Sequence, residues 1–158
     1  MKKTMIIGIL ALFAAACSGN KTHETGSKEE GSSVESGHSA NPSYDPNRGE
    51  GKFKSVQIAA TLDATMAETG NKIFSVKCGS CHKMTEEKLV GPGWKGVTSR
   101  HQAPWIMNFI TNTDEMINKD PKAQAQLEIC LVRMPNQNLA DADARALLEL
   151  MRKNDGVK

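Results

Sequence analysis

Aromatic residues are scarce in this sequence: Phe, Trp and Tyr together make up 4% of its 158 residues. A chain of this length allows one globular domain, and so few large rings leave that domain little apolar bulk for a packed core. The chain has no run of basic residues and a net charge of only +2, which does not fit a nucleic-acid binder. No stretch alternates apolar and polar residues like a half-buried β-strand, so helices and loops are expected.

Cysteine is also rare, and we expect different roles for the four cysteines. Cys78 and Cys81 are followed directly by His82, and C-x-x-C-H is the attachment signature of c-type haem, with thioether bonds from both thiols and the histidine as proximal iron ligand. A zinc ribbon would need a second Cys pair, which the sequence lacks. A thioredoxin-like dithiol would follow a strand, and no strand pattern precedes the motif. The motif predicts one covalent haem c, which would supply the missing apolar bulk.

The N-terminus has the pattern of a targeting segment. Lys2 and Lys3 precede a short apolar stretch over residues 5–16, which ends in three alanines before Cys17. This resembles a bacterial lipoprotein signal peptide, in which residues 1–16 are removed and Cys17 carries the lipid. Ala14 stands where that family usually has Leu, and an ordinary secretory signal or an uncleaved anchor are the alternatives. All three export the domain, so we expect it on the periplasmic side of a bacterial membrane, held there by its lipid.

The residues after the predicted lipidation site are too polar to form a core. Residues 17–54 are rich in Ser, Gly, Glu, Lys and Asn, and such a composition predicts a flexible, lipid-anchored tether. His23 and His38 lie in it and are expected to be solvated. The folded domain is expected over residues 55–158. Within it Cys130 has no partner, and we interpret it as a buried helical residue.

Apolar residues recur at helical spacing in four parts of this domain, which predicts an all-α fold. The first predicted helix ends at the C-x-x-C-H motif, and Asp63 or Thr61 can cap its start. Pro104 and Pro121 suit the first turns of the second and third helices. The predicted helices cover residues 63–77, 103–111, 121–131 and 141–153.

Several landmarks, in this order and spacing, resemble a class I c-type cytochrome domain. They are the segment 70–74 (Gly-Asn-Lys-Ile-Phe), the C-x-x-C-H motif, the segment 91–97 (Gly-Pro-Gly-Trp-Lys-Gly-Val) and Met134-Pro135 before the last helix. The resemblance covers about 90 residues, from Asp63 to Lys153. It implies a small helical domain wrapped around one covalent haem, with the first and last helices crossing where Gly70 and Phe74 meet Leu147 and Leu150.

The resemblance also implies roles for individual side chains. Cys78 and Cys81 would form the haem thioethers and His82 would bind the iron. The carbonyl of Pro92 would accept the Nδ1 proton of this histidine, which fixes its tautomer and makes it a better donor, and Trp94 would pack on the haem.

The sixth iron ligand has to come from elsewhere in the domain. Met134 occupies the family's axial position, about fifty residues after the motif in a loop that Pro135 closes. His101 is the second candidate and Met116 the third. A thioether favours Fe(II) and raises the reduction potential, whereas a second imidazole lowers it.

With both axial positions filled, the iron would carry electrons and bind no substrate, so we expect an electron-transfer protein that is not an enzyme. As a monomer, it would pass single electrons from a membrane quinol-oxidising complex to a terminal reductase or oxidase. The region from 105–110 to 134–139 is similar to cytochrome c domains associated with nitrous oxide reductases. Lysines and an arginine near the motif are candidates for a positive rim that steers an acidic partner: Lys72, Lys77, Lys83, Lys88, Lys95 and Arg133. The alternative function is a haem enzyme or gas-binding sensor with an open distal site.

Overall fold

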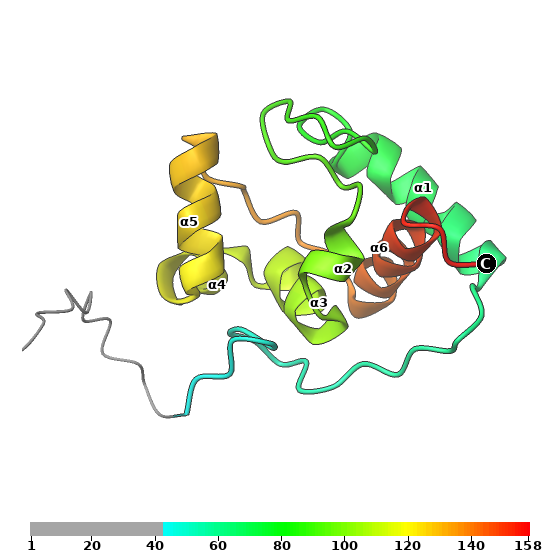
Figure 1. The fold of residues 1–158 in the computed structure, drawn as a ribbon, viewed down its shortest axis with the longest axis horizontal. Helices are drawn as coiled ribbons and strands as arrows, with labels where there is room; N and C mark the ends of the chain where they lie inside the picture. Colours follow the sequence, from blue (N-terminus) through cyan, green and yellow to red (C-terminus); the bar gives the residue numbers. More distant parts are fainter. Residues whose placement is uncertain (1–42) are drawn as a thin grey trace, which may run out of the picture. The chain divides into compact units, whose positions relative to one another are not determined.

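The described part of the computed structural model covers residues 43–158. This part contains helices and loops and no β-strand, so the predicted all-α class is confirmed. The signal peptide and the lipidated Cys17 are expected in residues that lie outside this part. The helices, in chain order (Figure 1), are α1 (Ala64–Lys77), α2 (Val97–Arg100), α3 (Ala103–Thr111), α4 (Thr113–Lys119), α5 (Pro121–Cys130) and α6 (Asp141–Asn154). None of the helices within residues 43–158 is long and apolar enough to cross a bilayer.

All four predicted helices are present, with ends that differ by no more than one residue from the prediction. Side-chain caps fix the starts of two of them, α1 and α5. The side chain of Asp63 accepts a hydrogen bond of 2.9 Å from the backbone N–H of Met66 at the start of α1, and Asp120 caps α5 in the same way through Ala123, at 2.8 Å. The short helices α2 and α4 were not predicted, because four to seven residues give too little periodicity to recognise.

Helices α1 and α6 pack side by side and form the frame of the domain (Figure 1). Gly70 lies where they cross. A Cβ atom at this position would overlap the carbonyl oxygen of Ala146, lie 2.7 Å from the carbonyl carbon of the same residue and lie 3.0 Å from Cβ of Leu150. The close approach therefore requires glycine, and the predicted contact between Gly70 and α6 is confirmed.

The core lies between this frame and helices α3 and α4. The apolar face of α6 contributes buried side chains that include Leu147, Leu148 and Met151, and α3 contributes Trp105 and Ile106. Burial of such side chains is the main stabilising contribution to a fold of this size. The same packing fixes the positions of the loops that leave α1 and enter α6.

A buried ion-pair cluster holds the chain that enters α1 against α6. Glu149 is 1% exposed and its carboxylate pairs with Arg145 at 2.6 Å and with Arg152 at 2.7 Å. The same carboxylate accepts the backbone N–H of Asp63 at 2.9 Å, and the Arg152 guanidinium donates to the carbonyl of Ala59 at 2.6 Å. Every member has a partner, as burial of charge requires.

Residues 44–53 form a segment, here termed the N-terminal strap, that packs on the helical domain. The side chain of Asn108 is fully buried and binds the strap at two points: it accepts the N–H of Phe53 and donates to the carbonyls of Arg48 and Phe53, each at 2.9 Å. The hydroxyl of Tyr44 donates to the Asp120 carboxylate. The polar composition of these residues predicts a flexible tether, but backbone hydrogen bonds to the buried side chain of Asn108 hold them on the domain. The boundary expected between residues 54 and 55 therefore moves at least to Tyr44.

Candidate functional site

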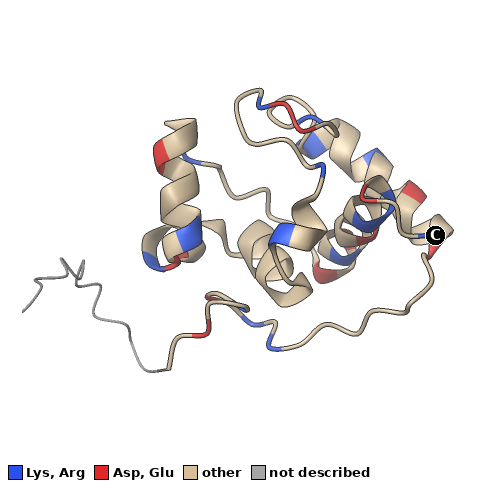
Figure 2. Cartoon of the chain, viewed as in Figure 1, with Lys and Arg blue, Asp and Glu red and all other residues tan. Residues whose placement is uncertain are grey.

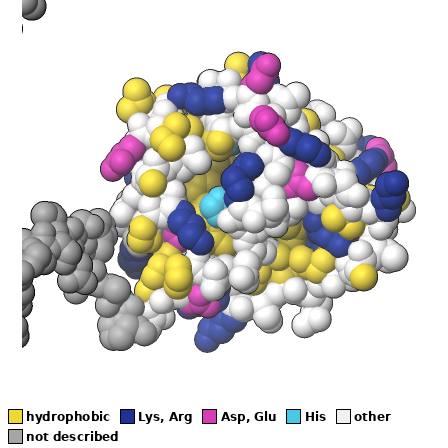
Figure 3. Space-filling view, viewed as in Figure 1, with side chains coloured by type: hydrophobic (Ala, Val, Ile, Leu, Met, Phe, Trp, Pro, Cys, Tyr) yellow, Lys and Arg dark blue, Asp and Glu magenta, His cyan; other side chains and the backbone are white. Residues whose placement is uncertain are grey.

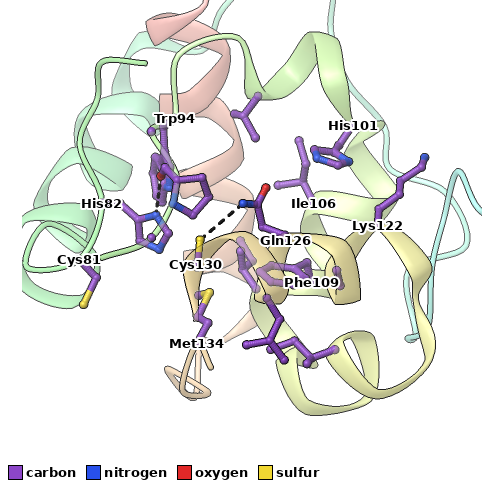
Figure 4. Close-up of a pocket in the computed structure, with 18 of the residues that line it drawn as sticks. Cys81, His82, Trp94, His101, Ile106, Phe109, Lys122, Gln126, Cys130 and Met134 are labelled. Carbon is purple, nitrogen blue, oxygen red and sulfur yellow. Dashed lines mark hydrogen bonds between the residues drawn. The ribbon is translucent and has the colours of Figure 1, made fainter. Parts of the chain in front are cut away.

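A cavity opens among α3, α5, α6, the loop between α1 and α2, and the loop between α5 and α6 (Figure 4). It measures about 1080 Å³ when the part open to solvent is included. Most of the lining is apolar, including Trp94, Ile106, Phe109, Ile110, Leu127 and Met151.

The C-x-x-C-H motif folds as a tight turn directly after α1. The backbone N–H groups of Cys81 and His82 both donate to the carbonyl of Cys78, at 3.0 and 2.9 Å. This turn brings the side chains of Cys81 and His82 to the cavity wall. Cys78 is 6% exposed, belongs to the core and does not line the cavity, and burial raises the pKa of its thiol to about 11.

The ring of His82 is fixed by the backbone of the following loop. Its Nδ1 atom lies 2.8 Å from the carbonyl oxygen of Pro92, the contact that the resemblance implies. Because a carbonyl can only accept, Nδ1 carries the proton, and Nε2 keeps its lone pair for a ligand bond. Burial lowers the pKa of His82, and the bond to Pro92 opposes this effect. A basic nitrogen with a fixed orientation suits metal coordination.

Trp94 forms the side of the cavity next to this histidine. Its indole is 6% exposed and packs edge-on against Phe74 of α1, with 4.7 Å between the ring centroids. The centroid of the His82 ring lies 5.7 Å away. Trp94 thus joins the frame helix, the histidine and the cavity wall in one aromatic contact.

Residues 67–155 match the family model described as Cytochrome c. The chain belongs to the cytochrome c family. A domain of this family carries covalent haem c and transfers electrons.

Two solved structures agree with this assignment. The chain is 30% identical to cytochrome c from Rhodothermus marinus, over 66% of this chain and 90% of that one, with a TM-score of 0.64. An engineered form of that cytochrome c gives the same identity, coverage and TM-score. A cytochrome c domain from Pseudomonas putida is 31% identical over 53% of this chain and 85% of that chain, with a TM-score of 0.48. No curated protein sequence matches.

The candidates for the sixth ligand lie in different places of the cytochrome c domain. Met134 and His101 both line the cavity, and Met134 belongs to the loop between α5 and α6 (Figure 4). Met116 is fully buried in α4, does not line the cavity, and its sulfur accepts the backbone N–H of Glu50 in the N-terminal strap at 3.0 Å. The structure therefore separates the third candidate from the site.

The charge around the cavity fits haem, which is apolar over its ring and carries two anionic propionates. Arg100, Lys122 and Arg133 line the cavity, and no Asp or Glu does. Figure 3 shows a histidine in a hollow, with basic side chains on either side. Gly91 adds a further sign of fit, because a Cβ atom there would lie 2.8 Å from Nδ1 of His82, so only the bare backbone lets the ring reach its place.

The wall of the cavity that α5 forms was not predicted from the sequence. Gln126 and Cys130 of α5 line it, and the amide of Gln126 donates to the Cys130 sulfur at 3.5 Å (Figure 4). Cys130 is buried, as expected for it, but it also faces the site. Lys122 joins them from the start of the same helix. The weak apolar pattern of α5 gave no sign that this helix forms one wall.

The six basic residues expected to form a rim are engaged to different degrees. Lys83 pairs with Glu87 at 2.6 Å and Arg133 with Asp114 at 3.3 Å. Lys77, Lys88 and Lys95 donate to backbone carbonyls. Both signs of charge are spread over the helices and loops of the described chain (Figure 2).

Proposed function

We propose that this cytochrome c is a one-electron carrier in which His82 and Met134 are the axial ligands of the iron and Cys78 and Cys81 hold the haem by thioether bonds. The observation that carries the proposal is that His82, with Nε2 free, and Met134 line the same apolar cavity. Haem held by His and Met supplies a raised potential and small reorganisation on electron transfer. With both residues bound to it, the iron would have no position open to substrate.

The protein side chains have supporting tasks in this proposal. Pro92 fixes the tautomer of His82, and Trp94 closes the cavity beside it. The apolar lining excludes water, and a low dielectric constant around the iron favours the state with the smaller charge. Together these residues stabilise Fe(II) and raise the potential further.

We also propose that the domain works outside the cytoplasm on a lipid anchor. A chain cleaved before Cys17 would carry lipid on that residue, and the tether would let the domain move between partners at one membrane. Those partners would be a membrane quinol-oxidising complex and a periplasmic reductase or terminal oxidase. The resemblance of residues 105–139 favours nitrous oxide reductase as the reductase. A mature protein whose N-terminal residue is not a lipid-modified Cys17, as read by mass spectrometry, would contradict the lipid anchor.

The absorption spectrum of the purified holoprotein, with and without carbon monoxide, tests the electron-carrier proposal. A closed His/Met site predicts no spectral shift when carbon monoxide is added to the reduced protein. The wild type should carry one covalent haem per chain, and the double variant Cys78→Ala, Cys81→Ala should carry none. A carbon monoxide shift in the wild type would mean an open or labile distal site and would favour the haem enzyme or gas-binding sensor. Protein made with the haem-attachment machinery but free of haem would contradict both.

A further inference from the structure

The loop that carries Met134 is held to the rest of the domain by side chains. It comprises residues 132–139, between α5 and α6, and none of its backbone groups forms a hydrogen bond with another backbone group of the described chain. Two polar contacts join it to other elements. The ammonium group of Lys77, at the end of α1, donates to the carbonyl of Gln137 at 3.1 Å, and the guanidinium of Arg133 reaches α4. The position of this loop therefore depends on few groups.

Arg133 makes the more extensive of these two contacts. Its Nη2 atom donates to the side-chain oxygen of Asn118 at 2.9 Å, and it lies 3.2 Å from the backbone carbonyl oxygen and 3.3 Å from Oδ1 of Asp114. Its Nε atom lies 3.3 Å from the same Oδ1. A planar guanidinium that engages two residues through two of its nitrogens fixes a direction as well as a distance. The single bond of Lys77 cannot do this.

Helix α4 is a firm support for this contact. Asp114 and Asn118 are four residues apart, so they lie on one face of the helix, and both are exposed. The opposite face is buried through Thr113, Met116 and Ile117, of which the first two are 0% exposed. The side chains that receive Arg133 thus project from a helix that is fixed in the core.

The turn that leads into the loop does not hold the loop by itself. Leu131 ends α5 with a φ of 59°, in the left-handed region that leucine rarely adopts, and its N–H donates to the carbonyl of Leu127 at 2.8 Å. The side chain of Leu131 is 83% exposed and adds little packing. Arg133 follows two residues later, where the chain has left this unfavourable turn and first contacts another helix.

We infer that Arg133 is a positioning residue for the Met134 thioether, because it ties the loop to α4 one residue before the proposed ligand. The contact keeps the sulfur at the iron and the distal position closed. This inference rests on the proposed function, since it needs Met134 to be an iron ligand. It also gives Arg133 a task inside the domain, whereas the sequence analysis considered it for a positive rim that steers a partner.

The contact favours a closed loop over an open one in which Met134 has left the iron. Met134 and Leu139 are half-buried and pack against the core, so the closed loop also has apolar contacts. The side chains of Arg133 and Asp114 are 43% and 62% exposed. A charge pair that is exposed to this degree, with good geometry, supports a change of about two- to fivefold in the population of the open loop.

Binding of added imidazole to the oxidised holoprotein tests this inference. Imidazole can bind only after Met134 has left, so the rate at saturating imidazole measures opening of the loop. Arg133→Gln should raise this rate about two- to fivefold, and Arg133→Lys, which keeps the charge but loses the fork, should raise it less. Asp114→Ala combined with Asn118→Ala should also raise it. Adding Arg133→Gln to that pair should have no further effect, because the partners are already absent.

The matched control is Lys119→Gln, which removes an ion pair of 2.6 Å with Glu115 on the same helix. Neither residue contacts the loop through a printed polar group of the described chain, so the rate should stay at the wild-type value. Hydrogen exchange measured by mass spectrometry gives a readout that does not depend on imidazole. Exchange of residues 131–138 should be faster in Arg133→Gln and unchanged in Lys119→Gln.

An unchanged rate or unchanged exchange of the loop in Arg133→Gln would overturn the inference and leave the electron-carrier proposal intact. An equal increase in Lys119→Gln would also overturn it, because any change on α4 would then loosen the loop. A wild type without the iron–sulfur absorption band would overturn both, since Met134 would not be bound to the iron.

Discussion

The Nδ1 atom of His82 lies 2.8 Å from the carbonyl oxygen of Pro92, and the backbone of Gly91 lies against the same ring. Two consecutive residues of one loop therefore set both the tautomer and the position of the proposed iron ligand. The loop is in turn tied to the motif, because the N–H of Gly91 donates to the carbonyl of Cys81 at 2.9 Å. The orientation of the ligand is thus a property of the backbone.

Replacing Gly91 by Ala should disturb the iron site directly. The added Cβ would lie 2.8 Å from Nδ1 and 2.9 Å from Nε2 of His82, so the ring has to move and the bond to Pro92 has to lengthen. We expect less covalent haem per chain and a carbon monoxide shift in the haem that remains, both read from absorption spectra. Gly79→Ala is the matched control inside the motif, since its Cβ meets nothing closer than 3.4 Å. Equal haem content in the two variants would contradict this account of Gly91.

Replacing Gly70 by Ala should weaken the crossing of α1 and α6. Alanine favours a helix by about 1 kcal/mol over glycine, but its Cβ would overlap the carbonyl of Ala146. Forced separation of packed helices typically costs about 1–3 kcal/mol, so we expect a net decrease in the free energy of unfolding, measured by urea denaturation. Asn71→Ala, at the exposed neighbouring position, should be neutral or stabilising. A more stable Gly70→Ala protein would show that the helix crossing accommodates a Cβ atom at this position.

Of the helices that the sequence predicted, α1 and α5 begin at the capping residues Asp63 and Asp120, whereas α3 and α6 have clear apolar periodicity and no side-chain cap. The resemblance implied His82 and Met134 as ligands of one iron, and both line one cavity together with Cys81. Sequence patterns could not reveal the strap, because it is held through the buried side chain of Asn108, more than fifty residues away.

The wall formed by α5 was hidden for a related reason. Gln126 and Lys122 are polar residues on a helix with little apolar periodicity, and such residues are usually solvated. Only the fold shows that they face the cavity. Contacts between distant, polar segments are decided by tertiary packing, which local periodicity does not encode.

Replacing Asn108 by Ala should release the N-terminal strap. The variant loses three hydrogen bonds of 2.9 Å and leaves the strap groups at Arg48 and Phe53 without their partner. We expect a loss of about 2–3 kcal/mol in the free energy of unfolding and faster hydrogen exchange at the amide of Phe53. Asn112→Ala, which loses a single bond of 3.4 Å to the strap, is the control and should have a much smaller effect. A Phe53 amide that stays protected in Asn108→Ala would argue against Asn108 as the anchor.

The contact between Tyr44 and Asp120 predicts a specific pH dependence of stability. Burial, followed by the hydrogen bond to the Asp120 carboxylate, holds the pKa of Tyr44 well above its ordinary value of 10.0. The folded state thus favours the protonated phenol, so this contribution is complete below pH 10 and is lost as the pH rises toward the folded pKa.

Unfolding free energies of the wild type and Tyr44→Phe, compared between pH 8 and pH 11, isolate this effect because the sequence has a single tyrosine. Tyr44→Phe should be less stable at pH 8, and the difference between the two proteins should shrink above pH 10. A difference that stays constant across this range would mean that the phenol does not bind the carboxylate in solution.

The central claim, that His82 and Met134 hold the iron of an electron carrier, is tested most directly by the weak long-wavelength iron–sulfur band of the oxidised holoprotein. The measurement compares the wild type with Met134→Leu and with Met151→Leu, a methionine that lines the same cavity from α6. The account predicts the band in the wild type and in Met151→Leu, and its loss in Met134→Leu together with a carbon monoxide shift on reduction. A band that persists in Met134→Leu would contradict it.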